Sequence, residues 1–163
     1  MSIWWSLHLR REAASVPLAR RLLLGTMETA GVDPDVSYEL SVALTEACAN
    51  AVEHGGGGEP GGTGRAYRVT AYLDGETCRI EVADSGPGFP GAGPGHFGPG
   101  RAGAESAPAP TAPSDDAEHG RGMRLIEELA DHVQFGNRSG RGGAVVSFDK
   151  MLKWKDGPSL LMV

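Results

Sequence analysis

Glu46 and Asn50 are the two side chains that point most directly to a chemistry. They lie four residues apart in a stretch with helical spacing, Thr45-Glu-Ala-Cys-Ala-Asn50-Ala-Val-Glu-His54, so both project from nearly the same side of a helix. An asparagine oxygen is a neutral ligand that suits Mg²⁺ when phosphates supply the charge, and a glutamate can orient or deprotonate an attacking hydroxyl. Taken alone, the pair is more typical of a solvated helix face than of a catalytic site.

A second element, Asp84-Ser-Gly86-Pro-Gly88, follows an apolar strand pattern. Its glycines let the backbone come close to a flat ligand, and the Asp84 carboxylate could accept a hydrogen bond from an adenine amino group. In isolation, an aspartate followed by two glycines is more typical of an ordinary turn after a strand.

A third element, Gly120-Arg121-Gly122, is expected to open a helix. The unpaired amides and the positive dipole end of a helix start attract phosphate, although glycine often precedes helices that bind nothing. Arg121 and Arg124 are both candidates for offsetting the charge that develops in phosphoryl transfer, and their spacing does not separate them. The three elements together, in this order, predict a site that holds a magnesium nucleotide and acts on its terminal phosphate.

Composition bounds the class of protein. The 163 residues are 40% hydrophobic and carry a formal net charge of −6, which suits a single domain with its own core and argues against binding nucleic acid through a basic face. The apolar N-terminal run is too short to span a membrane and lacks a signal-type cleavage region. Cys48 and Cys78 have neither metal-ligand spacing nor a disulfide framework. We therefore expect a cytoplasmic protein with no direct nucleic-acid partner and no membrane partner.

The N-terminal part predicts a strand followed by a helix. Apolar and polar residues alternate over 5–10, which is typical of a strand that buries one face. Ser15 is expected to cap a helix that ends at Gly31, with Leu18 and Leu22 in its inner stripe.

A second helix is expected to begin at Asp33-Pro34 and to end near His54, where four glycines follow. Its apolar residues recur at helical spacing and are expected to face the core. These are Val36, Leu40, Ala43, Leu44, Ala47 and Ala51.

The remaining pattern predicts four strands and one helix. Asp74-Gly75 is a strong hairpin signal between the first two of these strands. The expected strands are 66–73, 77–83, 133–137 and 143–150, and the expected helix is about 122–131. This order favours an α+β fold, a two-layer sandwich of a mixed, mostly antiparallel β-sheet with helices on one face.

We expect one domain over 1–150, with two additions. Residues 90–118 are dominated by Pro, Gly, Ala and Ser, which predicts a flexible insertion that could act as a lid over bound nucleotide. Residues 151–163 form an apolar tail that either packs on the sheet or docks a partner.

Three motifs together resemble the N box and the two glycine boxes of the GHKL (Bergerat-fold) ATPases. They are Glu46-Ala-Cys-Ala-Asn50 with His54-Gly55, Asp84-Ser-Gly-Pro-Gly88-Phe89, and Gly120-Arg-Gly-Met123. The short chain, without a phospho-accepting histidine helix or a transducer domain, is similar to the anti-sigma factor serine/threonine protein kinases of that superfamily.

The resemblance implies roles for the first two boxes. Glu46 matches the general base of the family and Asn50 its magnesium ligand. Asp84 matches the acid that fixes the adenine amino group, and Gly86 and Gly88 shape the floor of the pocket.

The third box, Gly120-Arg121-Gly122-Met123, matches the lid-edge segment whose amides meet the phosphates. The implied cofactors are ATP and Mg²⁺. The implied partners are a sigma factor and a STAS-type anti-anti-sigma protein that is phosphorylated on a serine, and dimers are common in the family.

The chain departs from the family in the last strand region. Many relatives have a threonine after a glycine there, whereas this chain has Gly143-Ala144, and Ser147 is the nearest substitute. Two other functions stay open beside an anti-sigma kinase: a nucleotide-binding switch that sequesters a partner without phosphorylating it, and a slow stand-alone ATPase.

Overall fold

The computed structural model describes residues 2–54, 66–84, 97–99, 115–137 and 143–155. Within these ranges the chain forms three helices and six strands. In chain order they are β1 (Ile3–Arg10), α1 (Ser15–Ala30), α2 (Pro34–His54), β2 (Ala66–Leu73), β3 (Thr77–Asp84), β4 (Phe97–Pro99), α3 (Asp115–Leu129), β5 (His132–Asn137) and β6 (Ala144–Met151).

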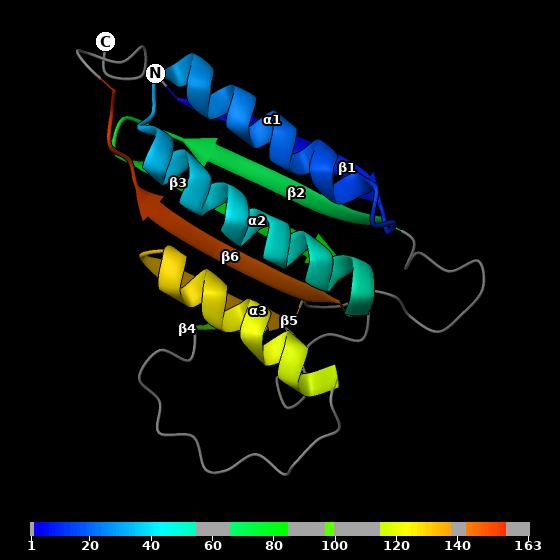
Figure 1. The fold of residues 1–163 in the computed structure, drawn as a ribbon. Helices are drawn as coiled ribbons and strands as arrows, with labels where there is room; N and C mark the ends of the chain where they lie inside the picture. The colour runs from blue at the N-terminus through cyan, green and yellow to red at the C-terminus, as the bar shows by residue number, and fades with distance from the viewer. Residues whose placement is uncertain (1, 55–65, 85–96, 100–114, 138–142, 156–163) are drawn as a thin grey trace.

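The described strands form one sheet in the order β1-β2-β3-β6-β5-β4. Each pairing between these strands is antiparallel. The helices cover one face of the sheet, and α2 lies between α1 and α3 (Figure 1). The predicted α+β sandwich with helices on one face is confirmed.

The core lies between the helices and the sheet. Val69 in β2, Ile80 in β3 and Phe148 in β6 point toward the helices and are at most 1% exposed. Burying one such side chain contributes about 1.5–3 kcal/mol. The six α2 residues that were expected to face the core are all buried, so the predicted phase of this helix is confirmed.

Helix α1 buries a different stripe from the predicted one. Leu18 and Leu22 are 52% and 39% exposed, whereas Ala19, Leu23 and Met27 are fully buried. Both sets have helical spacing. The set that faces the sheet is the one whose apolar stripe continues to both ends of α1. The prediction for Leu18 and Leu22 is therefore wrong.

The ends of α1 follow the sequence signals in part. Ser15 is the first helical residue rather than the cap, and its Oγ donates to the Glu12 carbonyl at 2.7 Å. Gly31 ends the helix as predicted, with a φ of 85°. This left-handed conformation favours glycine because it has no Cβ.

Two aspartates fix turns where the sequence predicted them. Asp33 Oδ1 accepts a hydrogen bond from the Asp35 backbone N–H at 2.8 Å and so caps α2. Asp74 Oδ1 accepts the backbone N–H groups of Glu76 and Thr77 at 2.7 and 2.6 Å, which closes the β2–β3 hairpin.

Helix α3 begins earlier than its glycine spacing predicts. It spans Asp115–Leu129 instead of about 122–131, so Gly120 and Gly122 lie inside the helix. Two parts of the 90–118 segment thus belong to regular elements: the start of α3, and β4, which pairs with β5. The rest of that segment lies outside the described residues.

Strand β6 crosses the expected domain boundary at 150 and ends at Met151. Leu152 is buried in the core, and residues 153–155 pair with 31–33 through backbone hydrogen bonds of 2.7 and 2.9 Å. The first residues of the 151–163 segment therefore pack on the domain, and 156–163 lie outside the described residues. Among the described helices, none combines the length and apolarity that crossing a bilayer requires.

Candidate active site

Glu46 and Asn50 meet the backbone of α3 at Gly122. Both side chains are half-buried on α2. A Cβ added to Gly122 would lie 3.1 Å from Glu46 Oε2 and 3.5 Å from both Asn50 Nδ2 and Oδ1. The lack of a side chain at Gly122 is what lets α3 come this close without displacing the carboxylate. The structure thus brings these two side chains together beside one glycine of α3.

Met123 makes the next contact between the two helices. The Asn50 Nδ2 amide donates to the Met123 sulfur at 3.7 Å, and Met123 is 9% exposed. Because the nitrogen of the amide is turned to the sulfur, the contact fixes the orientation of the Asn50 side chain. The Asn50 oxygen is the atom suited to a metal ion.

Asp84 is held by a backbone group from the neighbouring strand. It is the last residue of β3 and is 8% exposed. The Ala144 N–H at the start of β6 donates to Asp84 Oδ1 at 3.0 Å. The sequence did not indicate this contact, because it depends on the register between β3 and β6 and on no side chain of Ala144.

These groups gather at one end of the helix layer. In Figure 1, β6 begins at the end of the molecule where α2 ends and α3 begins. Helix α2 packs against both β3 and β6, and Asp84 ends β3 beside Ala144, the first residue of β6. The base candidate, the metal-ligand candidate and the purine-anchor candidate therefore share one region.

Ser147 does not take the place of the missing threonine. Side chains alternate along a strand, and its neighbours Val146 and Phe148 face the helices. Ser147 thus lies on the opposite face of the sheet, where its Oγ accepts a hydrogen bond from Arg79 Nε at 3.1 Å. The idea that Ser147 could compensate beside adenine is wrong.

The other residues of the predicted site are placed in part. Gly86 and Gly88 lie outside the described residues. Gly120 and Arg121 belong to α3, beyond its first turn, where backbone N–H groups bond within the helix instead of being left unpaired. The prediction that Gly120-Arg121-Gly122 opens the helix is wrong in this conformation. The Arg124 side chain is exposed.

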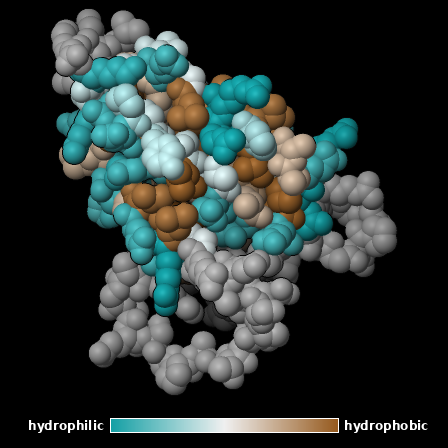
Figure 2. Space-filling view, in the orientation of Figure 1, coloured by the Kyte–Doolittle hydropathy of each residue, from teal (hydrophilic) through white to brown (hydrophobic). Residues whose placement is uncertain are grey.

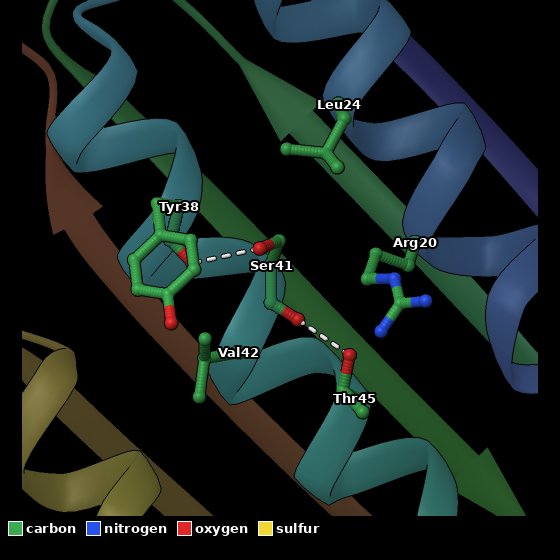
Figure 3. A pocket seen from close by; sticks show the side chains of 6 residues that line it. All are labelled: Arg20, Leu24, Tyr38, Ser41, Val42 and Thr45. Carbon is green, nitrogen blue, oxygen red and sulfur yellow. Dashed lines mark hydrogen bonds between the residues drawn. The ribbon is translucent and has the colours of Figure 1, made fainter.

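A groove of about 330 Å³ lies elsewhere, between α1 and α2. Figure 3 shows that Arg20 and Leu24 come from α1, and that Tyr38, Ser41, Val42 and Thr45 come from α2. Glu46 and Asn50 face α3 instead, so this groove is not the predicted nucleotide site. Figure 2 shows the helix-covered face as separate hydrophobic patches among hydrophilic residues.

The family model of the histidine kinase-like ATPase domain matches residues 9–150. The chain belongs to this family. The match extends from the end of β1 to the end of β6, so it includes each element that positions the candidate site of this histidine kinase-like ATPase.

This histidine kinase-like ATPase is similar to two known proteins, an RsbW kinase and a protein with an RsbW domain. It is 32% identical over 134 residues to the serine-protein kinase RsbW of Bacillus pumilus, which covers 82% of this chain and 78% of that protein. It also resembles the crystal structure of the RsbU and RsbW domains of Rv1364c from Mycobacterium tuberculosis, with a TM-score of 0.60 and 19% identity. That match covers 93% of this chain and 32% of the other, and it supports the fold.

The donor set of this histidine kinase-like ATPase fits a magnesium nucleotide. Asn50 offers one neutral oxygen, and Mg²⁺ takes most of its ligands from phosphate and water. Asp84 offers a carboxylate whose Oδ1 is oriented by a backbone N–H, which suits an amino group of a purine. Gly122 leaves room beside Glu46 that a Cβ would fill.

Proposed function

We propose that this chain is an ATP-dependent serine-protein kinase of the anti-sigma type. It binds a sigma factor and phosphorylates a serine of a STAS-type anti-anti-sigma partner, with ATP as donor and Mg²⁺ as cofactor. The observation that carries the proposal is the contact of Glu46 and Asn50 with Gly122, at the end of the molecule that also holds Asp84. The similarity to a serine-protein kinase of Bacillus pumilus supports protein phosphorylation over other uses of ATP.

In the proposed reaction, the serine oxygen forms a bond to the γ-phosphorus as the bond to the β,γ-bridging oxygen breaks. ADP leaves with that electron pair, and Glu46 takes the serine proton. Asn50 ligates Mg²⁺, which when bound offsets the charge of the phosphates. Asp84 accepts a hydrogen bond from the adenine amino group, and the Ala144 N–H keeps its carboxylate in place.

The test uses ATP labelled at the γ-phosphate, the purified chain and candidate anti-anti-sigma proteins. Label should appear on a serine of one partner. Glu46→Gln should lower the rate of transfer by about 10²–10⁴-fold, because the base is lost, and should leave ATP binding in place. Glu28→Gln is the matched control, since Glu28 is an exposed glutamate on α1, and it should transfer label at the wild-type rate.

Three results would contradict the proposal. A Glu46→Gln variant with the wild-type rate would remove Glu46 from the role of base. Binding of Mg·ATP without label on any partner would favour the nucleotide-binding switch. Phosphate release that no partner accelerates would favour the stand-alone ATPase.

A further inference from the structure

The sulfur of Met123 meets the side-chain amide of Asn50 between two neighbouring helices. Helices α2 and α3 lie side by side (Figure 1), and Asn50 Nδ2 donates a hydrogen bond to Met123 Sδ at 3.7 Å. Met123 is 9% exposed and belongs to the hydrophobic core, together with the fully buried Ile126 one turn further along α3. The core therefore holds the sulfur in a fixed place against Asn50.

The contact with Met123 distinguishes the two ends of the Asn50 amide, whereas the approach of Gly122 does not. A Cβ added to Gly122 would lie 3.5 Å from both Nδ2 and Oδ1, so this packing would be equally close if the two atoms exchanged places. A thioether sulfur accepts hydrogen bonds and has no proton to donate, so it favours the amide nitrogen over the amide oxygen. The sulfur thus selects the orientation in which the nitrogen faces Met123.

The selected orientation is the one that a metal ion needs. Mg²⁺ takes oxygen ligands, and an amide nitrogen offers protons where a ligand must offer a lone pair. Because Met123 engages the nitrogen, the Asn50 oxygen is the atom left for Mg²⁺. A side chain that also populated the opposite orientation would bind the ion more weakly, in proportion to the fraction of molecules that are competent.

We propose that Met123 is a positioning residue for the magnesium site, whose sulfur holds the Asn50 amide with its oxygen available to the metal ion. The inference rests on the proposed function, because it deepens the role of Asn50 as a ligand of the magnesium nucleotide. Asp84 is held separately by the Ala144 N–H. Loss of the sulfur therefore weakens the binding of the metal ion and leaves the purine anchor unchanged.

The first test is Met123→Leu, which removes the acceptor and keeps an apolar side chain of similar volume. The gain in ATP affinity on adding Mg²⁺, measured by calorimetry relative to the affinity in EDTA, should shrink about two- to tenfold, the equivalent of one ordinary hydrogen bond. The affinity in EDTA should stay at the wild-type value. Met27→Leu is the matched control, since Met27 is a fully buried methionine on α1, and it should match the wild type in both measurements.

A double variant shows whether Met123 acts through Asn50. Asn50→Ala removes the proposed ligand, and adding Met123→Leu to it should reduce the magnesium-dependent gain no further, because both changes act on one interaction. A further independent loss in the double variant would show that Met123 serves the metal site by another route, and would overturn the positioning role.

The orientation of the amide can also be observed in the protein without nucleotide. The chain has two asparagines, Asn50 and Asn137, so labelling with ¹⁵N-asparagine gives two side-chain amide signals, and Asn137 on β5 is the internal reference. In the wild type, the Asn50 amide protons should show a nuclear Overhauser contact with the Met123 methyl group. In Met123→Leu these protons should exchange with water about two- to tenfold faster, and those of Asn137 should not change. Equal exchange of the Asn50 protons in both proteins would overturn the inference.

The outcomes distinguish this inference from the proposed function. An unchanged magnesium-dependent gain, or an equal loss of affinity in EDTA and in Mg²⁺, would overturn the role of Met123 while the kinase stands. If the wild type transfers no label to any partner, the proposed function fails, and calorimetry and amide exchange still decide the role of Met123. If the wild type binds no ATP, both proposals are overturned.

Discussion

Replacing Gly122 by alanine should make the protein more stable and less active. Alanine is favoured over glycine inside a helix by about 0.8–1 kcal/mol, and Gly122 has no positive φ that would oppose the change. The new Cβ would lie 3.1 Å from Glu46 Oε2, closer than an ordinary contact, so the carboxylate must move by a few tenths of an ångström. It can do so by rotation, because it is the free end of a long side chain, and much of the gain in helix stability should remain.

The expected results are a Tm that rises by up to about 2–4 °C, the usual shift for 1 kcal/mol in a domain of this size, and a kcat that falls about tenfold. Calorimetric thermal scans and the labelled-ATP transfer assay measure the two quantities. The matched control is Gly25→Ala, because Gly25 is also inside a helix but a Cβ there would meet nothing within 4 Å. It should gain the same stability and keep full activity.

A Gly122→Ala variant with wild-type kcat would refute the reasoning. It would show either that Glu46 does not act from the position seen here, or that α3 leaves α2 before phosphotransfer. A Tm that falls by several degrees would show instead that Glu46 cannot yield, and that the contact is part of a rigid core.

Three further changes test other parts of the structure. Asp84→Asn should weaken ATP binding about tenfold or more in calorimetry, since hydrogen bonds to charged groups contribute about 1.5–3 kcal/mol, and wild-type affinity would contradict its role as purine anchor. Lys150→Met should lower the free energy of unfolding, measured by urea titration, by about 2 kcal/mol. The largely buried Lys150 Nζ pairs with Glu39 and donates to the Leu129 carbonyl of α3, both at 2.8 Å. An unchanged urea midpoint would argue against this link. At pH values below about 6.5 the His132→Asn variant should have a lower Tm than the wild type, and the difference should disappear at higher pH. The reason is that a hydrogen bond to Asp149 raises the pKa of His132 in the folded state. A difference in Tm that grows with pH would contradict this sign.

Local signals in the sequence were enough to predict most of the fold. Asp33 and the glycines after His54 set both ends of α2, and one apolar stripe fixed its phase. Helix α1 offered two apolar stripes with the same spacing, and periodicity alone cannot choose between Leu18 with Leu22 and the set that includes Leu23. The choice depends on which set finds a continuous partner on the sheet.

The second glycine box, Gly120-Arg121-Gly122, shows a different limit of prediction from the sequence. Glycines usually mark the ends of helices, which favoured a helix start at Gly120. In the structure Gly122 lies within α3 at a position where a Cβ would come 3.1 Å from Glu46 Oε2, a tertiary contact that no local pattern in the sequence reveals. The Ala144 contact to Asp84 was hidden for a similar reason, since the backbone supplies it. The contact between the Tyr67 hydroxyl and Ser15 Oγ had only a weak signal in the sequence, because a tyrosine in an apolar strand needs some partner for its hydroxyl but the pattern does not say which.

The position of β6 has a consequence for how the protein matures during translation. Among the strands that the structure describes it comes last in sequence, yet it lies in the middle of the sheet between β3 and β5. While the ribosome is still making β6, the five described strands that precede it form two groups without a bridge, and the carboxylate of Asp84 lacks the amide that orients it. The nascent polypeptide should therefore gain affinity for nucleotide late and abruptly, when the final strand inserts.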